Sequence, residues 1–333
     1  MAFRVSSTLV EIEGLQKWFP LKSDTLASLI GRGEEQYVRA VDGIDLTVGA
    51  GEIVGLAGES GCGKSTTGMT LVRLYEPSGG RILFEGQDVA PLQGKGLQEF
   101  RRLAQIIFQD PFSSLNPRFT VKRAVMEPLI IHRIGQTEEE RLELIRAALD
   151  LAGLLPPDHF LDRFPHQLSG GQRQRVAIAS AIVLQPRFLV ADEPVSMLDV
   201  SIRAGILELL QSYAEELEMG ILYISHDLST MRHICDRVAI MYLGKIVEIG
   251  PSNVLLSQPH HPYVKALVSA APKMVGGDMS RVIPIIGEVP DAINIPTGCR
   301  FWPRCLEATD VCREAEPALR SAGPDVQTAC HPR

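Results

Sequence analysis

The feature that most constrains the fold of this chain is GESGCGKS, Gly58 to Ser65, which fits the pattern G-x-x-x-x-G-K-S/T. It follows EIVGLAG, which is typical of a buried strand, and precedes TGMTLVRLYEP, which is typical of a helix. Glycines in such a loop let the backbone wrap a polyphosphate, and a helix N-terminus adds partial positive charge. The segment therefore predicts a strand, loop and helix unit that binds a nucleotide.

Each position of this loop has an expected task. Lys64 should reach the β- and γ-phosphates, and the Ser65 hydroxyl should ligate Mg²⁺. The other residues should surround the phosphates: Gly58, Glu59, Ser60, Gly61, Cys62 and Gly63.

The rest of the chain predicts an α/β fold. TLVEIEGLQKWF, IDLTV, RILFEGQDV and RRLAQIIFQ have the pattern of strands, and residues 120–185 have a mainly helical pattern. TEEERLELIRAALDLAGL begins with Thr and has acidic residues in its first turn, as helices prefer. Strands RFLVADEP and GILYISHD flank the helix VSIRAGILELLQSYAEEL, which favours a parallel sheet covered by helices on both faces. After about residue 250, closely spaced prolines predict a small irregular appendage.

Composition excludes several classes of protein. The net charge of −7 gives no electrostatic case for nucleic-acid binding. No apolar run approaches the roughly 20 residues that span a bilayer. The N-terminal MAFRVSSTLVEIEG lacks the apolar core of a signal peptide. We therefore expect a cytoplasmic protein whose thiols are reduced.

Three further segments carry polar groups suited to phosphate chemistry. Asp192 and Glu193 end a predicted buried strand, where Asp192 would hold Mg²⁺ through water and Glu193 would polarise an attacking water. In LSGGQRQ, Ser169 is a natural helix N-cap, and the two following glycines bare the amides of a second anion site. Since one nucleotide does not need two such sites on one molecule, we expect a dimer. His226 follows a third strand and is placed to contact the γ-phosphate.

Together these segments resemble the ordered motif set of an ATP-binding cassette (ABC) ATPase, over about residues 8 to 250. The segments are GESGCGKS, Gln109 after IIF, LSGGQ, LVADE, SMLD and SHD. The resemblance implies a P-loop NTPase nucleotide-binding domain with a helical subdomain, ATP and Mg²⁺ as cofactors, and Glu193, His226 and Gln109 as catalytic residues.

The same resemblance assigns the other residues. Thr66 joins Lys64 and Ser65 in the phosphate loop, and Gln109 joins Ser65 and Asp192 at Mg²⁺. The signature segment is Ser169, Gly170, Gly171 and Gln172. Asp199 lies in the dimer-contact loop, and Met197 stands where the family usually has Ala. Phe19 resembles the aromatic residue that stacks on adenine, with Tyr37 as the alternative.

Two segments resemble importers for oligopeptides, dipeptides and nickel: FQDPFSSLNPRFTV, and QPHHPYVKALVSAAP with the GCRFWPRC that follows it. This implies an ATP-hydrolysing subunit that powers peptide import from the cytoplasmic face of the inner membrane. Its partners would be two permease subunits, an extracytoplasmic binding protein and a second ATPase, with the NPR wording favouring a heterodimer. The implied domains are 8–255, with a helical subdomain at about 119–185, and 256–333.

Other functions remain open at this point. A nickel or other small-solute importer of the same group is one alternative, and a non-transport ABC ATPase acting in DNA repair or translation is another. DNA-repair ATPases of this family carry a long coiled-coil insertion, and translation factors usually carry two fused cassettes. Neither feature is present in the sequence. A small-molecule P-loop kinase would lack LSGGQ.

Four of the six cysteines lie in the last few dozen residues, at Cys299, Cys305, Cys312 and Cys330. Their spacing, C-x5-C-x6-C-x17-C, is compatible with Zn²⁺, with an iron–sulfur cluster or with four unligated thiols. The resemblance favours a 4Fe-4S cluster. We expect this cluster to have a structural role rather than a redox-sensing one, because a short proline-rich segment can draw folding stability from metal ligation. Arg300 and Arg304 would either offset the charge of the cluster or be solvated. Cys62 and Cys235 are expected to be small buried residues.

Overall fold

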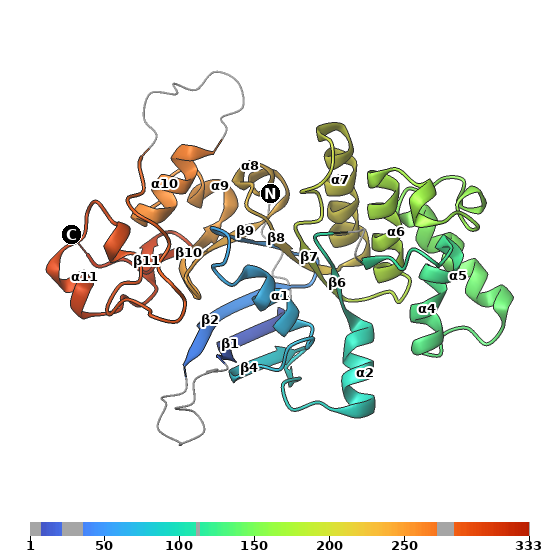
Figure 1. Cartoon of the computed structure of the whole chain (residues 1–333), viewed down its shortest axis with the longest axis horizontal. Helices are drawn as coiled ribbons and strands as arrows, with labels where there is room; N and C mark the ends of the chain where they lie inside the picture. The colour runs from blue at the N-terminus through green and yellow to red at the C-terminus, as the bar shows by residue number, and fades with distance from the viewer. Residues whose placement is uncertain (1–7, 22–35, 111–113, 272–282, 333) are drawn as a thin grey trace, which may run out of the picture. The chain divides into compact units, whose positions relative to one another are not determined.

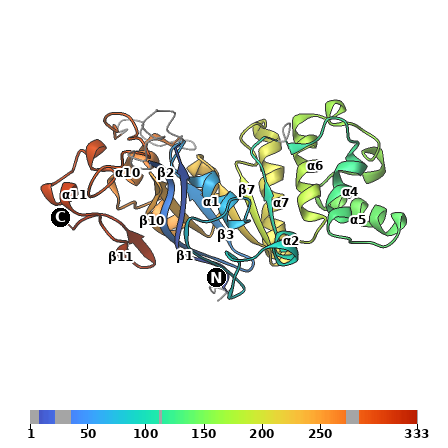
Figure 2. The same ribbon diagram turned by 60° about the horizontal axis from the view of Figure 1, so that its bottom comes forward.

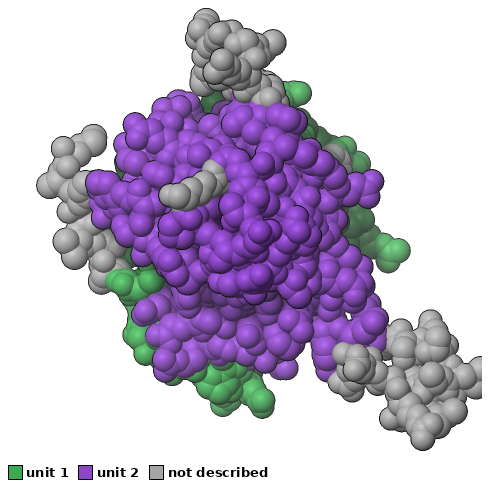
Figure 3. All heavy atoms as spheres, turned by 90° about the vertical axis from the view of Figure 1, so that its left-hand side faces the viewer, with its two compact units in different colours: residues 1–10, 47–53, 83–224 green, residues 11–46, 54–82, 225–333 purple. Residues whose placement is uncertain are grey.

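The computed structural model describes residues 8–21, 36–110, 114–271 and 283–332. The chain divides into two compact units, which Figure 3 distinguishes by colour. Unit 1 contains residues 1–10, 47–53 and 83–224, and unit 2 contains residues 11–46, 54–82 and 225–333. Each unit is therefore built from segments that lie far apart in the sequence.

Unit 1 contains a parallel arrangement of three strands in the order β8, β7, β6. Their bounds are Ala104–Ile107 for β6, Phe188–Asp192 for β7 and Gly220–Ile224 for β8. Every residue of β7 and β8 is buried, as expected for strands of a sheet covered on both faces. Phe188 lies between Ala104 of β6 and Gly220 of β8, so the strands run in step and end at the same edge.

Among the described residues of unit 1, the α-helices are the following (Figure 1). They are α2 (Gly94–Leu103), α4 (Val121–Ile131), α5 (Glu138–Leu151), α6 (Gly170–Ile182) and α7 (Val200–Leu217). Helices α4, α5 and α6 pack against one another within the stretch predicted to be helical, and Figure 2 shows them side by side. Thr137 and Glu140 form a capping box at the start of α5, which confirms the predicted start of this helix.

The prediction of one strand over RRLAQIIFQ is wrong in its first half. Arg101 to Leu103 are the last turn of α2, and the strand β6 begins only at Ala104. Helix α2 buries a single residue, Phe100, which packs edge-on against Phe84 with ring centroids 5.4 Å apart. One buried aromatic residue produces no repeating helical pattern in the sequence, and the apolar residues that follow suggested a strand.

Unit 2 contains the second group of strands, in the order β3, β9, β10, β12, β11. Strand β3 (Ile53–Ala57), which begins in unit 1, pairs in parallel with β9 (Arg237–Tyr242). Strand β9 pairs antiparallel with β10 (Lys245–Pro251). The C-terminal strand β12 (Val326–Thr328) pairs antiparallel with β10, and β11 (Arg320–Gly323) pairs antiparallel with β12. The prediction of a parallel sheet is therefore wrong for these strands, which form a mixed arrangement of parallel and antiparallel pairs.

The helices of unit 2 are short. They are α1 (Lys64–Leu71), α8 (Leu228–Ile234), α9 (Ser252–Leu255), α10 (Pro262–Ala270) and α11 (Asp310–Glu314), together with the single turn η4 (Trp302–Arg304). Among the described residues no helix is both long enough and apolar enough to span a membrane.

A separate four-stranded sheet has the order β2, β1, β4, β5. Its strands are β1 (Thr8–Pro20), β2 (Tyr37–Gly49), β4 (Gly79–Phe84) and β5 (Gln87–Asp88). RILFEGQDV is the β4–β5 hairpin rather than one strand, because Glu85 and Gly86 adopt positive φ and turn the chain. Most of the predicted loop between Pro20 and Gln36 lies outside the described residues.

The segment after residue 255 is less irregular than expected, since β11 and β12 belong to it. In the division into compact units, residues 225–333 stay together. A domain boundary between residues 255 and 256 therefore remains a prediction from composition and resemblance.

Candidate nucleotide site and four-cysteine site

The phosphate loop, residues 58–66, connects β3 to α1 in unit 2. Gly58 and Gly63 have φ values of 151° and 109°. A Cβ at Gly58 would lie 2.1 Å from the carbonyl oxygen of Met241, and one at Gly63 would lie 2.0 Å from that of Ala40. Only glycine fits at these two positions, so the loop backbone passes closer to its neighbours than any side chain would permit.

The Lys64 ammonium lies within the curve of this loop. It donates to the carbonyl oxygens of Gly58 at 2.8 Å and Glu59 at 2.9 Å, and Lys64 is only 7% exposed. Helix α1 begins after Gly63 without a side-chain cap, so its first amides are not covered by a capping side chain. Ser65 and Thr66 lie in its first turn. The loop thus joins a positive charge to a helix start without a side-chain cap, the arrangement that suits an anion.

The two candidates for contact with adenine lie at the ends of β1 and β2. Phe19 packs edge-on against Tyr75, with centroids 5.3 Å apart, and the Lys17 ammonium lies 4.9 Å from the Phe19 ring. Tyr37 packs instead against Trp18, at 6.2 Å.

His226 is exposed in unit 2, directly before helix α8. The next residue, Asp227, caps α8 by accepting from the Ser229 N–H at 2.9 Å. The capping bond of Asp227 therefore fixes the backbone directly after His226.

In unit 1 the structure brings Gln109 and Glu193 together. The Gln109 amide donates to the Glu193 carboxylate at 2.9 Å. This contact follows from the sheet, because Gln109 comes after β6 and Glu193 comes after the neighbouring parallel strand β7. Asp192 is 3% exposed at the end of β7. Glu193 has a φ of 46° and donates its N–H to the Ile224 carbonyl at 2.9 Å, which fixes the backbone directly after β7.

The signature segment begins α6 in unit 1, as predicted. Ser169 is its N-cap and forms a capping box with Gln172, with distances of 3.3 and 3.0 Å. A Cβ at Gly171 would lie 2.6 Å from the Ile202 side chain, so close packing against α7 requires glycine there. Asp199 is exposed at the start of α7, and Met197 is 58% exposed.

All four C-terminal cysteines line one small cavity in unit 2. All six cysteines of the chain lie in the described residues, and none is in a disulfide. Burial raises the pKa of Cys299 and raises that of Cys330 to about 11, with the neighbouring cysteines as a further cause. The folding of the chain therefore gathers four thiols that lie up to 31 residues apart in the sequence (330 − 299 = 31).

The described residues contain no group of three or more His, Cys, Asp or Glu side chains placed to hold a metal ion. The predicted metal-binding character of this region, by Zn²⁺ or by a 4Fe-4S cluster, is thus not shown. Two observations fit a larger group held by the thiols: all four cysteines face one cavity, and Trp302, which also lines it, has a buried indole N–H without a hydrogen-bond partner. Such N–H groups donate to the sulfur atoms of clusters.

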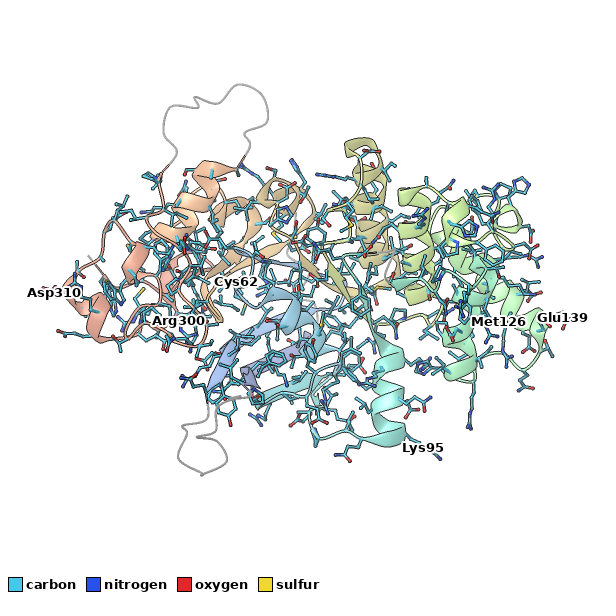
Figure 4. All side chains as sticks on the ribbon, in the orientation of Figure 1. Cys62, Lys95, Met126, Glu139, Arg300 and Asp310 are labelled. Atoms are coloured by element: carbon cyan, nitrogen blue, oxygen red, sulfur yellow. The ribbon has the colours of Figure 1, made fainter. Side chains whose placement is uncertain are left out.

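The prediction that the two arginines in GCRFWPRC are solvated is wrong, because both side chains are buried and paired (7% exposed). Arg300, labelled in Figure 4, forms an ion pair with Asp42 and donates to the Leu243 carbonyl at 2.6 Å. Arg304 forms a bidentate pair with Glu59 of the phosphate loop. No local pattern could reveal these partners, since 258 and 245 residues separate them.

Comparison with known proteins assigns both parts of the chain. Residues 41–196 match the ABC transporter family, and residues 247–312 match the family described as the oligopeptide/dipeptide transporter C-terminal region. The oligopeptide transport ATP-binding protein AppF of Bacillus subtilis is 44% identical over 97% of both chains. A putative peptide import ATP-binding protein of Brucella ovis is 44% identical, also over 97% of both.

Solved structures agree with this assignment. The ATP-binding cassette MJ0796, in a dimeric post-hydrolysis state with ADP and Pi, has a TM-score of 0.62 at 28% identity, covering 73% of this chain and 99% of its own. The cbiO1 protein of Clostridium perfringens, part of an ABC transporter complex, has a TM-score of 0.63 at 29% identity, covering 75% and 91%. This chain accordingly belongs to the ABC transporter ATPases, in the group that carries the oligopeptide/dipeptide transporter C-terminal region.

Proposed function

We propose that this chain hydrolyses ATP to power the import of peptides through a membrane permease. The observation that carries the proposal is the contact between Gln109 and Glu193 beside the buried Asp192. An amide holds a carboxylate at the end of a buried strand, in a chain that also has a complete phosphate loop. The peptide substrate is supported by the names of the relatives and by the matching C-terminal region.

The nucleotide-binding residues divide by chemistry. Lys64 and the amides of residues 58–66 bind the phosphates, Ser65, Gln109 and Asp192 hold Mg²⁺, and Phe19 stacks on adenine. Charge-assisted bonds from Lys64 to phosphate are about twice as strong as neutral ones. The Mg²⁺ ion supplies charge neutralisation on the phosphate oxygens when it is bound.

Hydrolysis requires a water in line with the γ-phosphorus. Glu193 accepts the proton of this water and His226 orients it, while Gln109 fixes the Glu193 carboxylate. General-base help of this kind contributes about 10²- to 10⁴-fold. The Glu193 carboxylate is suited to act as the general base, because the turn after β7 holds Glu193 at the edge of the sheet.

The assembly we propose is a dimer of two ATPase chains. In it Ser169 to Gln172 of one chain cover the nucleotide bound by the other, and Asp199 lies at the contact. The NPR segment, Asn116 to Arg118, favours a heterodimer, in which the second ATPase chain has a different sequence. Two permease subunits and an extracytoplasmic binding protein complete the transporter, with this chain on the cytoplasmic face of the membrane. The domains are 8–255 and 256–333.

For the four cysteines we propose a 4Fe-4S cluster held by Cys299, Cys305, Cys312 and Cys330. The shared cavity and the unpartnered indole N–H of Trp302 support it. Ligation supplies folding free energy to a short segment of this kind. Anaerobic purification should yield iron and sulfide in near-equal amounts with broad visible absorption. Protein with zinc, or with four titratable thiols and no metal, would exclude the cluster.

The experiment that tests the central proposal is Glu193→Gln. It should retain ATP binding while turnover falls at least about 100-fold, because the amide cannot accept a proton. The measurement is steady-state phosphate release by the reconstituted transporter, with nucleotide binding measured in parallel. Turnover within threefold of the wild-type value would rule out this role for Glu193.

The substrate is tested separately by uptake. Vesicles containing the chain with its neighbouring permease and binding protein should accumulate a labelled peptide on addition of ATP. Accumulation of nickel or another small solute, with no peptide uptake, would assign the chain to the alternative importer of the same group.

A further inference from the structure

The C-terminal segment, residues 256–332, contacts the phosphate loop directly. Arg304 of the single turn η4 pairs with both carboxylate oxygens of Glu59, at 2.6 and 3.2 Å. The arginine side chain is 7% exposed and that of Glu59 is 25% exposed. Such a planar, two-bond pair fixes the direction as well as the position of the carboxylate.

Glu59 is held at three points. Its N–H donates to the Tyr263 hydroxyl at 2.9 Å, its carbonyl accepts from Lys64 at 2.9 Å, and its carboxylate binds Arg304. Tyr263 comes from α10 and is fully buried, and burial raises the pKa of its hydroxyl. Two of these three groups, the N–H and the carboxylate, are therefore held by the C-terminal segment.

An aromatic cluster makes the contact rigid. The rings of Tyr242, Tyr263 and Phe301 lie with centroids 4.8 to 5.3 Å apart. The Arg304 guanidinium lies 5.9 Å from the Tyr242 ring. Edge-to-face contacts of this kind fix the orientation of each ring, so Arg304 and the Tyr263 hydroxyl have little freedom to leave Glu59.

The charge of Glu59 explains why this contact matters for ATP. A carboxylate next to the loop that takes a polyphosphate repels the ligand unless a cation compensates it. Arg304 supplies that cation from a nearly buried position, where solvent screens it little.

We infer that Arg304, with Tyr263, is a positioning residue for ATP: it holds Glu59 in place and cancels its charge, so that the C-terminal segment sets the affinity of the phosphate loop. The inference rests on the proposed binding of ATP at residues 58–66. Arg304 directly precedes Cys305, which lines the four-cysteine cavity. A change at that cavity is therefore transmitted to the nucleotide, and by linkage the nucleotide acts equally on the cavity.

The test measures the dissociation constant of the full-length chain for a fluorescent ATP analogue. Arg304→Ala should weaken binding about tenfold, and Arg304→Lys about threefold, because a lysine compensates the charge but loses the two-bond geometry. The matched control is Arg320→Ala, which removes an exposed guanidinium of the same segment, on β11 and outside the lining of the four-cysteine cavity. It should leave the dissociation constant within twofold.

A second substitution separates positioning from loss of structure. Adding Glu59→Gln to Arg304→Ala should return the dissociation constant to within threefold of wild type, since the uncompensated charge is gone. In steady-state assays Arg304→Ala should raise KM for ATP with less than a threefold change in kcat. A dissociation constant within twofold of wild type for Arg304→Ala, or no rescue by Glu59→Gln, would overturn the inference.

Milder variants serve if Arg304→Ala does not fold. Tyr263→Phe removes only the hydroxyl and should weaken ATP binding about threefold, by leaving the Glu59 N–H without its acceptor. Unchanged binding would contradict the inference. Cys305→Ser should weaken binding in the wild-type background and have no added effect with Arg304→Ala, and full additivity would overturn the coupling. Lys64→Ala serves as the reference, because normal binding by that variant would count against the proposed function itself.

Discussion

The phosphate loop and the signature segment are both glycine-rich starts of helices, yet they are built in different ways. At α1 the N-cap is Gly63, in a left-handed conformation without a side-chain cap. At α6 the N-cap is Ser169, whose capping box with Gln172 satisfies amides of the first turn. The first helix start has no side-chain cap, while the second has a capping box formed by its own side chains.

The glycines show the same contrast. Gly63 is forced by a carbonyl oxygen 2.0 Å from where a Cβ would lie, whereas the nearest atom at Gly170 is a Leu198 methyl group at 3.9 Å. The phosphate loop owes its shape to backbone contacts, and the signature segment owes its shape to side chains. Four substitutions can break or sharpen this comparison.

The largest effect is expected from Gly63→Ala. The methyl group would meet the Ala40 carbonyl in a backbone conformation that alanine rarely adopts, and should cost more than about 3 kcal/mol of folding free energy. Gly170→Ala should change it by less than about 0.5 kcal/mol. Urea denaturation of both variants measures these changes. Equal losses of unfolding free energy would mean that the backbone at Gly63 tolerates a side chain as well as the backbone at Gly170 does.

The next effect concerns the nucleotide. Lys64→Ala should weaken ATP binding by the single chain about 100-fold, because it removes a charged donor from the loop. Ser169→Ala should leave single-chain binding within threefold but reduce ATP-dependent dimer formation. Calorimetry and light scattering measure the two properties. A loss of single-chain binding in Ser169→Ala would show that the signature acts on the nucleotide of its own chain.

Ser169→Ala should also have a smaller effect on stability. Loss of the N-cap should cost about 1 kcal/mol. Hydrogen exchange at the first amides of α6 should quicken, while exchange in α1 stays the same. Unchanged exchange at α6 would mean that water replaces the capping hydroxyl without cost.

The smallest effect is a labelling rate. Cys62 is 2% exposed, and burial raises the pKa of its thiol. Since the thiolate is the reactive form, alkylation of Cys62 should be slower at pH 7 than in the unfolded chain. The rate should then rise with pH until it passes the raised pKa. Rapid labelling at pH 7 would show that the loop opens to solvent.

Much of the candidate site could be predicted because its motifs are local. The strand before Gly58, the N-cap at Ser169 and the buried strand before Asp192 each have a pattern within a few residues. The contact of Gln109 with Glu193 then follows from two neighbouring parallel strands. The hairpin at Glu85 was missed because it depends on positive φ at Glu85 and Gly86. The helix end at Leu103 was missed because α2 buries only Phe100 and so lacks a periodic signal.

By itself the sequence determined the motif set, the α/β class and the resemblance to one family of transporter ATPases. These depend on residue types at fixed short spacings, which hydrophobic periodicity and helix capping express directly. Only the tertiary structure decided that β11 and β12 join β10, that four thiols share a cavity, and that Arg304 reaches Glu59. The physical reason is that pairing between distant residues depends on the path of the folded chain, and no local pattern encodes that path.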